Sequence, residues 1–444
     1  MSVGIEPASL GRFRPLVGER YPQIQAAAAS ARQAFGERRI WHVNSTAQGG
    51  GVAEMLRALL PYVRGAGVDT RWLVLPELDG FFAVTKRIHN RLHGHQGDGG
   101  PLDDNARQTY ERALAWCAEE LGRLVEPSDV IYLHDPQTAG LVPAMRRAGP
   151  AVIWRCHVGV DQPDDFAREA WDFLRPYVEN ADAYVFSRRE YLWEGLDPGK
   201  AWFMPPVIDP FSPKNEDLDR SREDEALAAV AAKATILEEE PLPTDARVVA
   251  QISRWDRLKD PGGLLEIFER HLDDTSLQLL LVGPDSAGVS DDPEGAAVYA
   301  EVAERWRAMS AGRRRRARLV SLPMDDLREN ATMVNALQRR ADLIVQKSLA
   351  EGFGLTVAEA MWKARPLVAS RVGGIQDQVV DGETGTLVDD PRDLPAFARA
   401  IEAILRDPGR SARMGEAGRQ RVRDNYLAVD RLREYVELVS GLVG

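Results

Sequence analysis

The sequence predicts an α/β protein made of two doubly wound domains, and three observations lead to this prediction. Short apolar segments typical of strands alternate with longer helical segments along the chain, which implies parallel sheets covered by helices on both faces. A proline-rich bend at 204–210 interrupts this alternation near the middle and is a natural boundary. The 444 residues are many for one core and suit two domains of roughly 200 residues. We therefore expect domains over 1–210 and 211–418.

The first domain should open with a strand, a glycine-rich loop and a helix over 52–63. Apolar and β-branched residues predict its strands at 39–44, 70–75, 130–133, 151–155 and 183–186.

In the second domain, the acidic stretch 215–240 has alanines at helical spacing, and we expect a surface helix there. The strands that follow are expected at 248–252, 277–282, 318–322, 343–345 and 366–369. The run 277–282 is almost wholly apolar and stops at Gly283, as a buried parallel strand would. Ligands of such sheets bind beyond the carboxyl ends of the strands, so the strand-end loops are where we look for function.

Composition excludes several classes of protein. A net charge of −12 argues against nucleic acid as a partner. No apolar run approaches the roughly 20 residues that span a bilayer, and no signal-peptide pattern is present, so we expect a cytoplasmic protein without a membrane partner. Cys117 and Cys156 lack metal-like or redox-like spacing and are expected to be buried thiols. Asp217 and Asp219 follow no strand, and we expect no metal site.

The most informative segment is 347–361, where Glu351 and Glu359 flank a turn with Gly352 and Gly354. Glycine lets backbone N–H groups approach a ligand closely, and a helix start favours an anion. Carboxylates accept hydrogen bonds from sugar hydroxyls, so one glutamate could hold a hexose and the other a ribose. The alternative is an ordinary turn with a surface glutamate on each side. As a whole, the segment predicts a site for a phosphorylated, hydroxyl-rich ligand.

Positive charge for a diphosphate is available in a second strand-end loop. Arg254 and Lys259 follow the strand at 248–252, although Lys259 could be a surface lysine. The triplet Gly49-Gly50-Gly51 follows the first strand of the first domain, where backbone amides can face phosphates or a sugar. It is neither a Walker motif nor a dinucleotide fingerprint, which disfavours NTP hydrolysis and nicotinamide chemistry.

These residues resemble a known family. Glu351 and Glu359 with the glycine turn are similar to the E-x7-E signature of retaining glycosyltransferases of family 4, and the likeness continues through 365–375 and 381–385. In the first half, the segments 42–54, 81–86, 89–94 and 134–137 resemble the trehalose glycosyltransferring synthases of that family.

The resemblance implies a GT-B fold, in which two Rossmann-like domains face each other across a cleft, with a last helix at about 419–444 that returns to the first domain. It implies transfer of glucose from a nucleotide-glucose to free glucose, with retention of configuration, to form trehalose, reversibly or not. UDP-, ADP- and GDP-glucose all remain open as donors. No tightly bound cofactor is expected, Mg²⁺ is at most an activator, the partners are small sugars, and a homodimer is left open.

The resemblance also assigns roles to individual residues. His157 resembles the family histidine near the 6-hydroxyl of the donor hexose, and Arg254 with Lys259 resembles the pair that grips the leaving phosphates. The catalytic candidates are Glu351, Arg254, Lys259 and His157. The donor-binding candidates are Gly50, Gly51, Gly352, Phe353, Gly354, Leu355, Thr356 and Glu359. The acceptor-binding candidates, a polar set in the first domain, are Lys86, His89, Asn90, His134, Asp135, Gln137, Asp161 and Gln162.

Other functions stay open at this point. Another retaining transferase of the family would act on a sugar phosphate, glycerate or lipid. A nucleotide-sugar-binding protein with a degenerate site is disfavoured by the intact set of charged residues. A pyridoxal-dependent phosphorylase shares the general fold, but no cofactor-lysine motif is evident.

Overall fold

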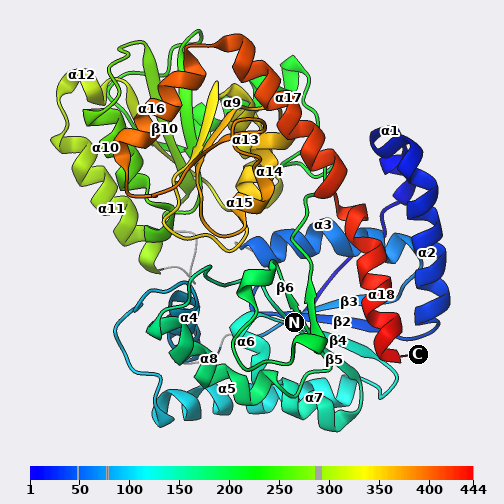
Figure 1. Ribbon diagram of the computed structural model, residues 1–444. Coiled ribbons are helices and arrows are strands. Elements are labelled where there is room, and N and C mark those ends of the chain that lie inside the picture. Colours follow the sequence, from blue (N-terminus) through cyan, green and yellow to red (C-terminus); the bar gives the residue numbers. More distant parts are fainter. Residues whose placement is uncertain (48–49, 77, 79, 286–292, 444) are drawn as a thin grey trace. The chain divides into compact units, whose positions relative to one another are not determined.

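The computed structural model describes residues 1–47, 50–76, 78, 80–285 and 293–443 and divides into two compact units. Unit 1 comprises Met1–Ile208 together with Tyr426–Gly444, and unit 2 comprises Asp209–Asn425. Each unit is built around one seven-stranded sheet with helices packed on it (Figure 1).

The sheet of unit 1 has the strand order β1-β3-β2-β4-β5-β6-β7. Its strands are β1 (Ser2–Val3), β2 (Ile40–Asn44), β3 (Thr70–Val74), β4 (Val130–His134), β5 (Ala151–Cys156), β6 (Ala183–Phe186) and β7 (Ala201–Phe203). Its helices are α1 (Arg14–Val17), α2 (Tyr21–Phe35), α3 (Gly51–Gly65), α4 (Phe81–Leu92), α5 (Asp104–Leu124), α6 (Asp135–Ala139), α7 (Val142–Ala148), α8 (Asp165–Val178) and α18 (Leu432–Val443).

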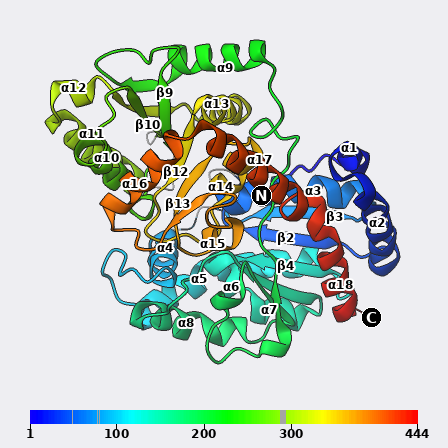
Figure 2. The same ribbon diagram turned by 45° about the horizontal axis from the view of Figure 1, so that its top comes forward.

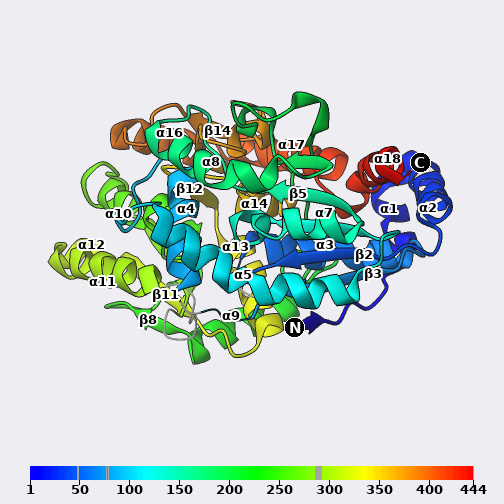
Figure 3. The ribbon, with the colours of Figure 1, turned by 90° about the horizontal axis from the view of Figure 1, so that it is seen from below.

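The two faces of this sheet pack into separate hydrophobic cores. Ile131 and Leu133 of β4 face a core formed with α4, α5, α7 and α8. Three of these helices, α4, α5 and α7, can be followed in Figure 3. Val130 and Tyr132 of the same strand face a second core with α2, α3 and α18. Alternate side chains of a strand point to opposite faces, so β4 is buried on both sides.

Unit 2 has the strand order β14-β13-β12-β9-β10-β11-β8. Its strands are β8 (Thr235–Leu237), β9 (Arg247–Ile252), β10 (Leu277–Pro284), β11 (Ala317–Leu322), β12 (Leu343–Gln346), β13 (Leu367–Ser370) and β14 (Thr386–Val388). Its helices are α9 (Arg220–Lys233), α10 (Pro261–Arg270), α11 (Pro293–Ala308), α12 (Ala311–Arg314), α13 (Leu327–Arg340), α14 (Leu355–Trp362), α15 (Ile375–Gln378), α16 (Leu394–Leu405) and α17 (Pro408–Asn425).

One face of the second sheet packs on α10, α11 and α16 in a single hydrophobic core. On the other face α13 lies against β9, with α9 beyond it, which can be followed in Figure 2. The acidic stretch therefore holds the expected surface helix, α9, which is followed by the edge strand β8.

The sheets are mixed and not wholly parallel, which corrects one expectation. β1 pairs antiparallel with β3, and β8 pairs antiparallel with β11. Both strands lie at a sheet edge and contain only two or three residues, too few for a periodic pattern to reveal them. All other strand pairs in the described residues are parallel.

The chain end groups with unit 1, but it is not the single helix expected at about 419–444. α17 ends at Asn425, Leu427 forms a short parallel bridge with Ile208, and a new helical segment begins at Ala428. The side chain of Asp430 accepts a hydrogen bond from the backbone N–H of Leu427 at 2.9 Å, which caps the new segment. α18 then packs against α2 within unit 1.

The cysteines and the longest helices complete the description of the fold. Cys117 and Cys156 are both buried free thiols, as expected. In the described part of the chain, no helix is both long and apolar enough to cross a membrane.

Candidate active site

Two loops of unit 2 lie side by side because their strands are neighbours. β9 and β12 pair in parallel, so the loops that follow them leave the same edge of the sheet. The loop after β9 ends in a short 3-10 helix, Arg257–Lys259, before α10 begins. The loop after β12 leads from Lys347 to the start of α14. The sequence motifs around Lys259 and Glu351 therefore meet in space.

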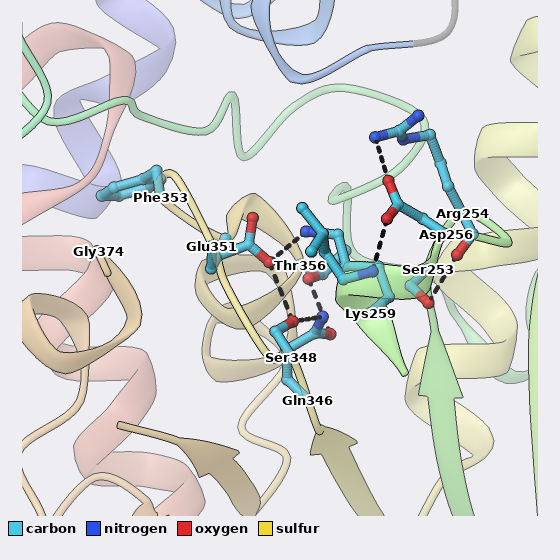
Figure 4. A network of polar contacts seen from close by, with 12 residues as sticks. Ser253, Arg254, Asp256, Lys259, Gln346, Ser348, Glu351, Phe353, Thr356 and Gly374 are labelled. Atoms are coloured by element: carbon cyan, nitrogen blue, oxygen red, sulfur yellow. Dashed lines mark hydrogen bonds and ion pairs between the residues drawn. The ribbon is translucent and has the colours of Figure 1, made fainter. Parts of the chain in front are cut away.

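Glu351 and Lys259 form an ion pair between these two loops (Figure 4). The distance from Lys259 Nζ to Glu351 Oε2 is 2.5 Å, and the two side chains are 16% and 10% exposed. Ser348 Oγ donates to the same carboxylate oxygen at 3.2 Å. Gln346 connects this group to α14, since it donates to Ser348 at 3.0 Å and accepts from Thr356 at 3.1 Å. The carboxylate is thus held in place while it stays partly accessible.

Arg254 lies on the same loop as Lys259 and is held by a carboxylate that the sequence did not single out. Its guanidinium pairs with Asp256 at 2.9 Å. The other oxygen of Asp256 accepts from the backbone N–H of Leu258 at 2.8 Å and so caps the 3-10 helix that carries Lys259. One buried aspartate therefore positions both candidate cations, Arg254 and Lys259.

The glycine turn brings backbone close to backbone at the start of α14. Gly354 is the residue before the helix and has φ +87°, a left-handed conformation that glycine adopts without strain. A Cβ on Gly374 would lie 2.7 Å from Phe353 Cα, so only glycine fits there. Phe353 itself is buried at 6% exposure, and Gln378 donates to its carbonyl at 2.5 Å. These contacts hold the N-terminus of α14 in a fixed place.

Glu359 is buried in α14 and has two polar partners. Lys214 pairs with one carboxylate oxygen at 3.3 Å, and the side-chain amide of Gln338 donates to the other at 3.2 Å. Lys363 follows one turn later and donates to Asn215 Oδ1 at 2.9 Å. Burial lowers the pKa of Lys363 to about 7, although the charge of Glu359 opposes this change. The second glutamate is thus part of the fold's polar interior and not a surface residue.

Unit 1 carries a row of three stacked histidines across neighbouring strands. His42 Nδ1 lies 3.0 Å from His134 Nε2, and His134 Nδ1 lies 3.3 Å from His157 Nε2. The rings are stacked with centroids 5.3 and 5.6 Å apart. Burial lowers the pKa of His42 to about 3 and keeps the pKa values of His134 and His157 well below the ordinary range. The three imidazoles are therefore neutral.

Asp135 and Arg155 complete this group. Asp135 has φ 63°, and its carboxylate accepts from the backbone N–H of His157 at 2.7 Å. Burial raises the pKa of Asp135 to about 7. Arg155 is 1% exposed and donates to Tyr435 Oη at 2.5 Å, and its charge further lowers the pKa values of the histidines. His134, Asp135 and His157 are thus one group, and His42 belongs to it.

The other candidates of unit 1 lie on several elements. Lys86, His89 and Asn90 lie on α4 at a spacing that places them on one helix face. Asp161 forms an ion pair with Arg188, and Gln137 and Gln162 lie on α6 and on the loop after β5. Gly50 precedes α3 and Gly51 is its first residue, whereas Gly49 lies outside the described residues.

The structure adds polar residues that the sequence analysis did not single out. They are His42, Lys214, Asp256, Asp260, Gln338, Ser348, Lys347 and Lys363. One signal was present, because only seven of the 56 basic residues are lysines. Four of these seven lie in the unit 2 network: Lys214, Lys259, Lys347 and Lys363.

Within the described ranges no group of three or more His, Cys, Asp or Glu side chains is arranged to hold a metal ion. Asp217 pairs with Arg339 and Arg419, and Asp219 caps α9, so both carboxylates serve the fold.

Comparison with known proteins identifies the class first. Residues 327–421 match the family described as glycosyl transferases group 1, and residues 42–193 match the family described as trehalose synthase, N-terminal domain. An α,α-trehalose-phosphate synthase (UDP-forming) from Burkholderia vietnamiensis has a similar fold, with a TM-score of 0.68, 16% identity, and coverage of 90% of this chain and 98% of that chain. The protein is a GT-B glycosyltransferase.

Two curated relatives define the family more closely. A trehalose synthase of Pyrococcus horikoshii is 35% identical over 97% of this chain and 96% of its own length. A trehalose synthase of Rubrobacter xylanophilus is 36% identical over 98% of this chain and 97% of its own length. The chain belongs to the trehalose synthase family, as its motifs predicted.

Proposed function

We propose that this enzyme transfers glucose from a nucleotide-glucose to free glucose, with retention of the anomeric configuration, to form trehalose. The observation that carries the proposal is the Lys259–Glu351 ion pair, which joins the two predicted motifs at neighbouring strand ends of unit 2. A diphosphate needs cations, and a hexose needs carboxylate acceptors. Both are available there within one network.

In this proposal unit 2 binds the donor. Lys259 and Arg254 neutralise the leaving diphosphate, on which negative charge grows as the bond to the anomeric carbon breaks. An ammonium group has three donors, so Lys259 can hold Glu351 and a phosphate oxygen at the same time. The N–H groups at the start of α14 add a positive dipole end. Glu351 accepts hydrogen bonds from the donor sugar, and Glu359 accepts them from the ribose.

The polar residues of unit 1 bind the sugar groups. His157 contacts the donor hexose near its 6-hydroxyl, and the acceptor glucose is held by the set Lys86, His89, Asn90, His134, Asp135, Gln137, Asp161 and Gln162. The neutral imidazoles suit an uncharged acceptor, because they offer hydrogen bonds without a fixed charge that needs a counter-ion.

The reaction needs no covalent glucosyl-enzyme. The acceptor hydroxyl attacks from the face that the phosphate leaves, its oxygen forms the new bond to the anomeric carbon, and its proton passes to the departing phosphate oxygen. A stable glucosyl adduct on a carboxylate, detected by mass spectrometry of the native enzyme, together with loss of turnover in Glu351→Gln, would contradict this scheme.

Product analysis tests the proposal directly. The enzyme is incubated with UDP-, ADP- or GDP-glucose and free glucose, and the disaccharide is identified by NMR. We expect α,α-trehalose together with release of the nucleoside diphosphate. A panel with glucose 6-phosphate, glycerate and a lipid acceptor serves as the comparison. If glucose were transferred to one of these compounds and not to free glucose, the proposed acceptor would be wrong.

A further inference from the structure

A second ion pair connects the same two loops as the Lys259–Glu351 pair. Lys347 is fully buried, and its ammonium pairs with the carboxylate of Asp260, whose side chain is 25% exposed. Lys347 is the first residue after β12, and Asp260 directly follows Lys259. Neither residue has a role in the function proposed above.

The backbone at Asp260 is shaped for this contact. Asp260 has φ 44° and ψ 55°, a left-handed conformation that is uncommon for residues other than glycine. Its other carboxylate oxygen accepts from the N–H of Gly263 at 2.9 Å and caps α10. A Cβ on Gly263 would lie 2.3 Å from the Asp260 carboxylate and 2.7 Å from Lys347 Nζ, so this position must be glycine for the pair to form.

Backbone contacts reinforce the connection on either side of the buried pair. Gln251, which is 1% exposed, donates to the carbonyl of Lys259 at 2.8 Å and accepts from the N–H of Lys347 at 3.1 Å. The N–H of Leu349 donates to the carbonyl of Leu258 at 2.7 Å. The backbone on both sides of Lys259 is therefore connected to the loop that carries Glu351.

We propose that the Lys347–Asp260 pair is a positioning device that fixes Lys259 for the diphosphate of the donor. Lys347 is inaccessible and acts through the loop, so it is a positioning residue and not a catalytic one. The inference rests on the proposed function, since it assumes that Lys259 binds phosphate. A long lysine side chain has much conformational freedom. Holding the backbone on both sides of Lys259 reduces the conformational entropy that is lost when Lys259 binds the diphosphate.

The test compares two ligands that differ by one phosphate. Calorimetry measures the dissociation constants of a nucleoside diphosphate and of its monophosphate, using UDP, ADP or GDP according to which binds best. In Lys347→Met we expect the diphosphate to bind about tenfold more weakly, in line with the loss of one well-placed charged hydrogen bond, and the monophosphate to bind almost as before. A variant that only destabilised the fold would weaken both ligands alike.

A double variant separates positioning from folding. Lys347→Met leaves a carboxylate without its cation, which is destabilising, so Tm should fall. In Lys347→Met with Asp260→Asn both charges are gone, and asparagine still tolerates the left-handed backbone and caps a helix. We expect Tm to recover, whereas the tenfold loss of diphosphate affinity persists. Recovery of the affinity together with Tm would overturn the proposal.

Arg318→Met is the matched control. Arg318 is a 2% exposed cation of the same unit and pairs with Glu238 at 3.0 Å, but it lies near the amino end of β11, away from the strand-end loops. Its loss should lower Tm without changing the preference for diphosphate. If the wild-type protein itself does not prefer diphosphate over monophosphate, the proposed donor site is wrong. If the wild type prefers the diphosphate and Lys347→Met shows the same preference, only the proposed positioning role of Lys347 is wrong.

Discussion

The strand ends of the two units carry polar groups of opposite character. In unit 1 the strand ends hold three stacked imidazoles whose pKa values are lowered, and Asp135, whose pKa is raised to about 7, beside the buried cation Arg155. In unit 2 the loops after β9 and β12, together with helix α14, hold paired charges, with lysines against the carboxylates of Glu351, Glu359 and Asp260. A neutral acceptor sugar needs hydrogen-bonding groups, whereas a charged nucleotide-sugar needs cations for its diphosphate. The difference therefore supports the proposal that unit 1 binds the acceptor and unit 2 the donor.

The strongest way to break this comparison is to remove one charge from unit 2. Lys259→Met should lower kcat/KM for glucosyl transfer about a hundredfold or more, which corresponds to roughly 2–4 kcal/mol of transition-state stabilisation. Steady-state kinetics with the preferred nucleotide-glucose measures this effect.

Lys233→Met is the control for that experiment. Lys233 forms an exposed ion pair with Glu329 in the same unit, and such pairs contribute about 0–1 kcal/mol to stability. Its kcat/KM should match the wild type. A loss below tenfold in Lys259→Met would mean that the lysine does not face the leaving phosphates.

The two units should also respond to pH in opposite ways. Asp135 has a folded pKa of about 7 against an ordinary value of 3.8, so the folded state holds its proton more tightly. Its contribution to stability is present at low pH and is lost as the pH rises from about 4 to 7. Lys363 has a folded pKa of about 7 against an ordinary value of 10.5, so the folded state releases its proton more readily. Its linkage therefore raises stability as the pH increases from about 7 to 10.5.

Tm measured against pH in two variants tests these opposite slopes. In Asp135→Asn the part of the decline between pH 4 and 7 that belongs to Asp135 should disappear. In Lys363→Met the part of the rise above pH 7 that belongs to Lys363 should disappear. Curves that stay parallel to the wild type would show that the two groups titrate at their ordinary values.

Glu359→Gln should give a smaller and more selective effect. The amide keeps the size of the side chain but loses the charge that holds Lys214, and charged hydrogen bonds are about twice as strong as neutral ones. We expect KM for the nucleotide-glucose to rise about tenfold, with little change in kcat. A donor whose ribose lacks its hydroxyls should show no such difference between the variant and the wild type. An equal difference with both donors would remove Glu359 from the ribose.

The sequence predicted the strands and motifs well because each carries a local signal. The run 277–282 is buried as β10, and the turn before α14 lies where its glycines indicated. The two antiparallel edge strands were missed because two or three residues have no period. The break at Leu427 was missed because it depends on a contact with Ile208, more than 200 residues away.

The sequence shows the motifs of the candidate site, but it does not show the contacts between them. Glu351 and Lys259 were visible as motifs, but their ion pair depends on β9 and β12 being neighbours. Lys347 and Asp260 lie close to these motifs in sequence, yet only the strand order shows that they meet. His42 lies in the middle of an apolar strand, where a histidine is more often a packing residue. Its role in the stack required the parallel register of β2 and β4.

The smallest expected effect is also the sharpest test of the neutral character of unit 1. His42, His134 and His157 should not titrate near pH 6.5, since burial holds the pKa of each well below that value. NMR spectra of ¹⁵N-labelled imidazoles report this directly, and unfolding in urea should return all three to ordinary titration near pH 6.5.

His134 contacts a neighbouring ring with each of its nitrogens. When neutral it donates to one ring and accepts from the other, so the tautomer of His157 is tied to that of His42. His42→Gln should therefore change the nitrogen shifts of His157 without charging it. A protonated His157 at pH 7 would remove the electrostatic contrast between the two units.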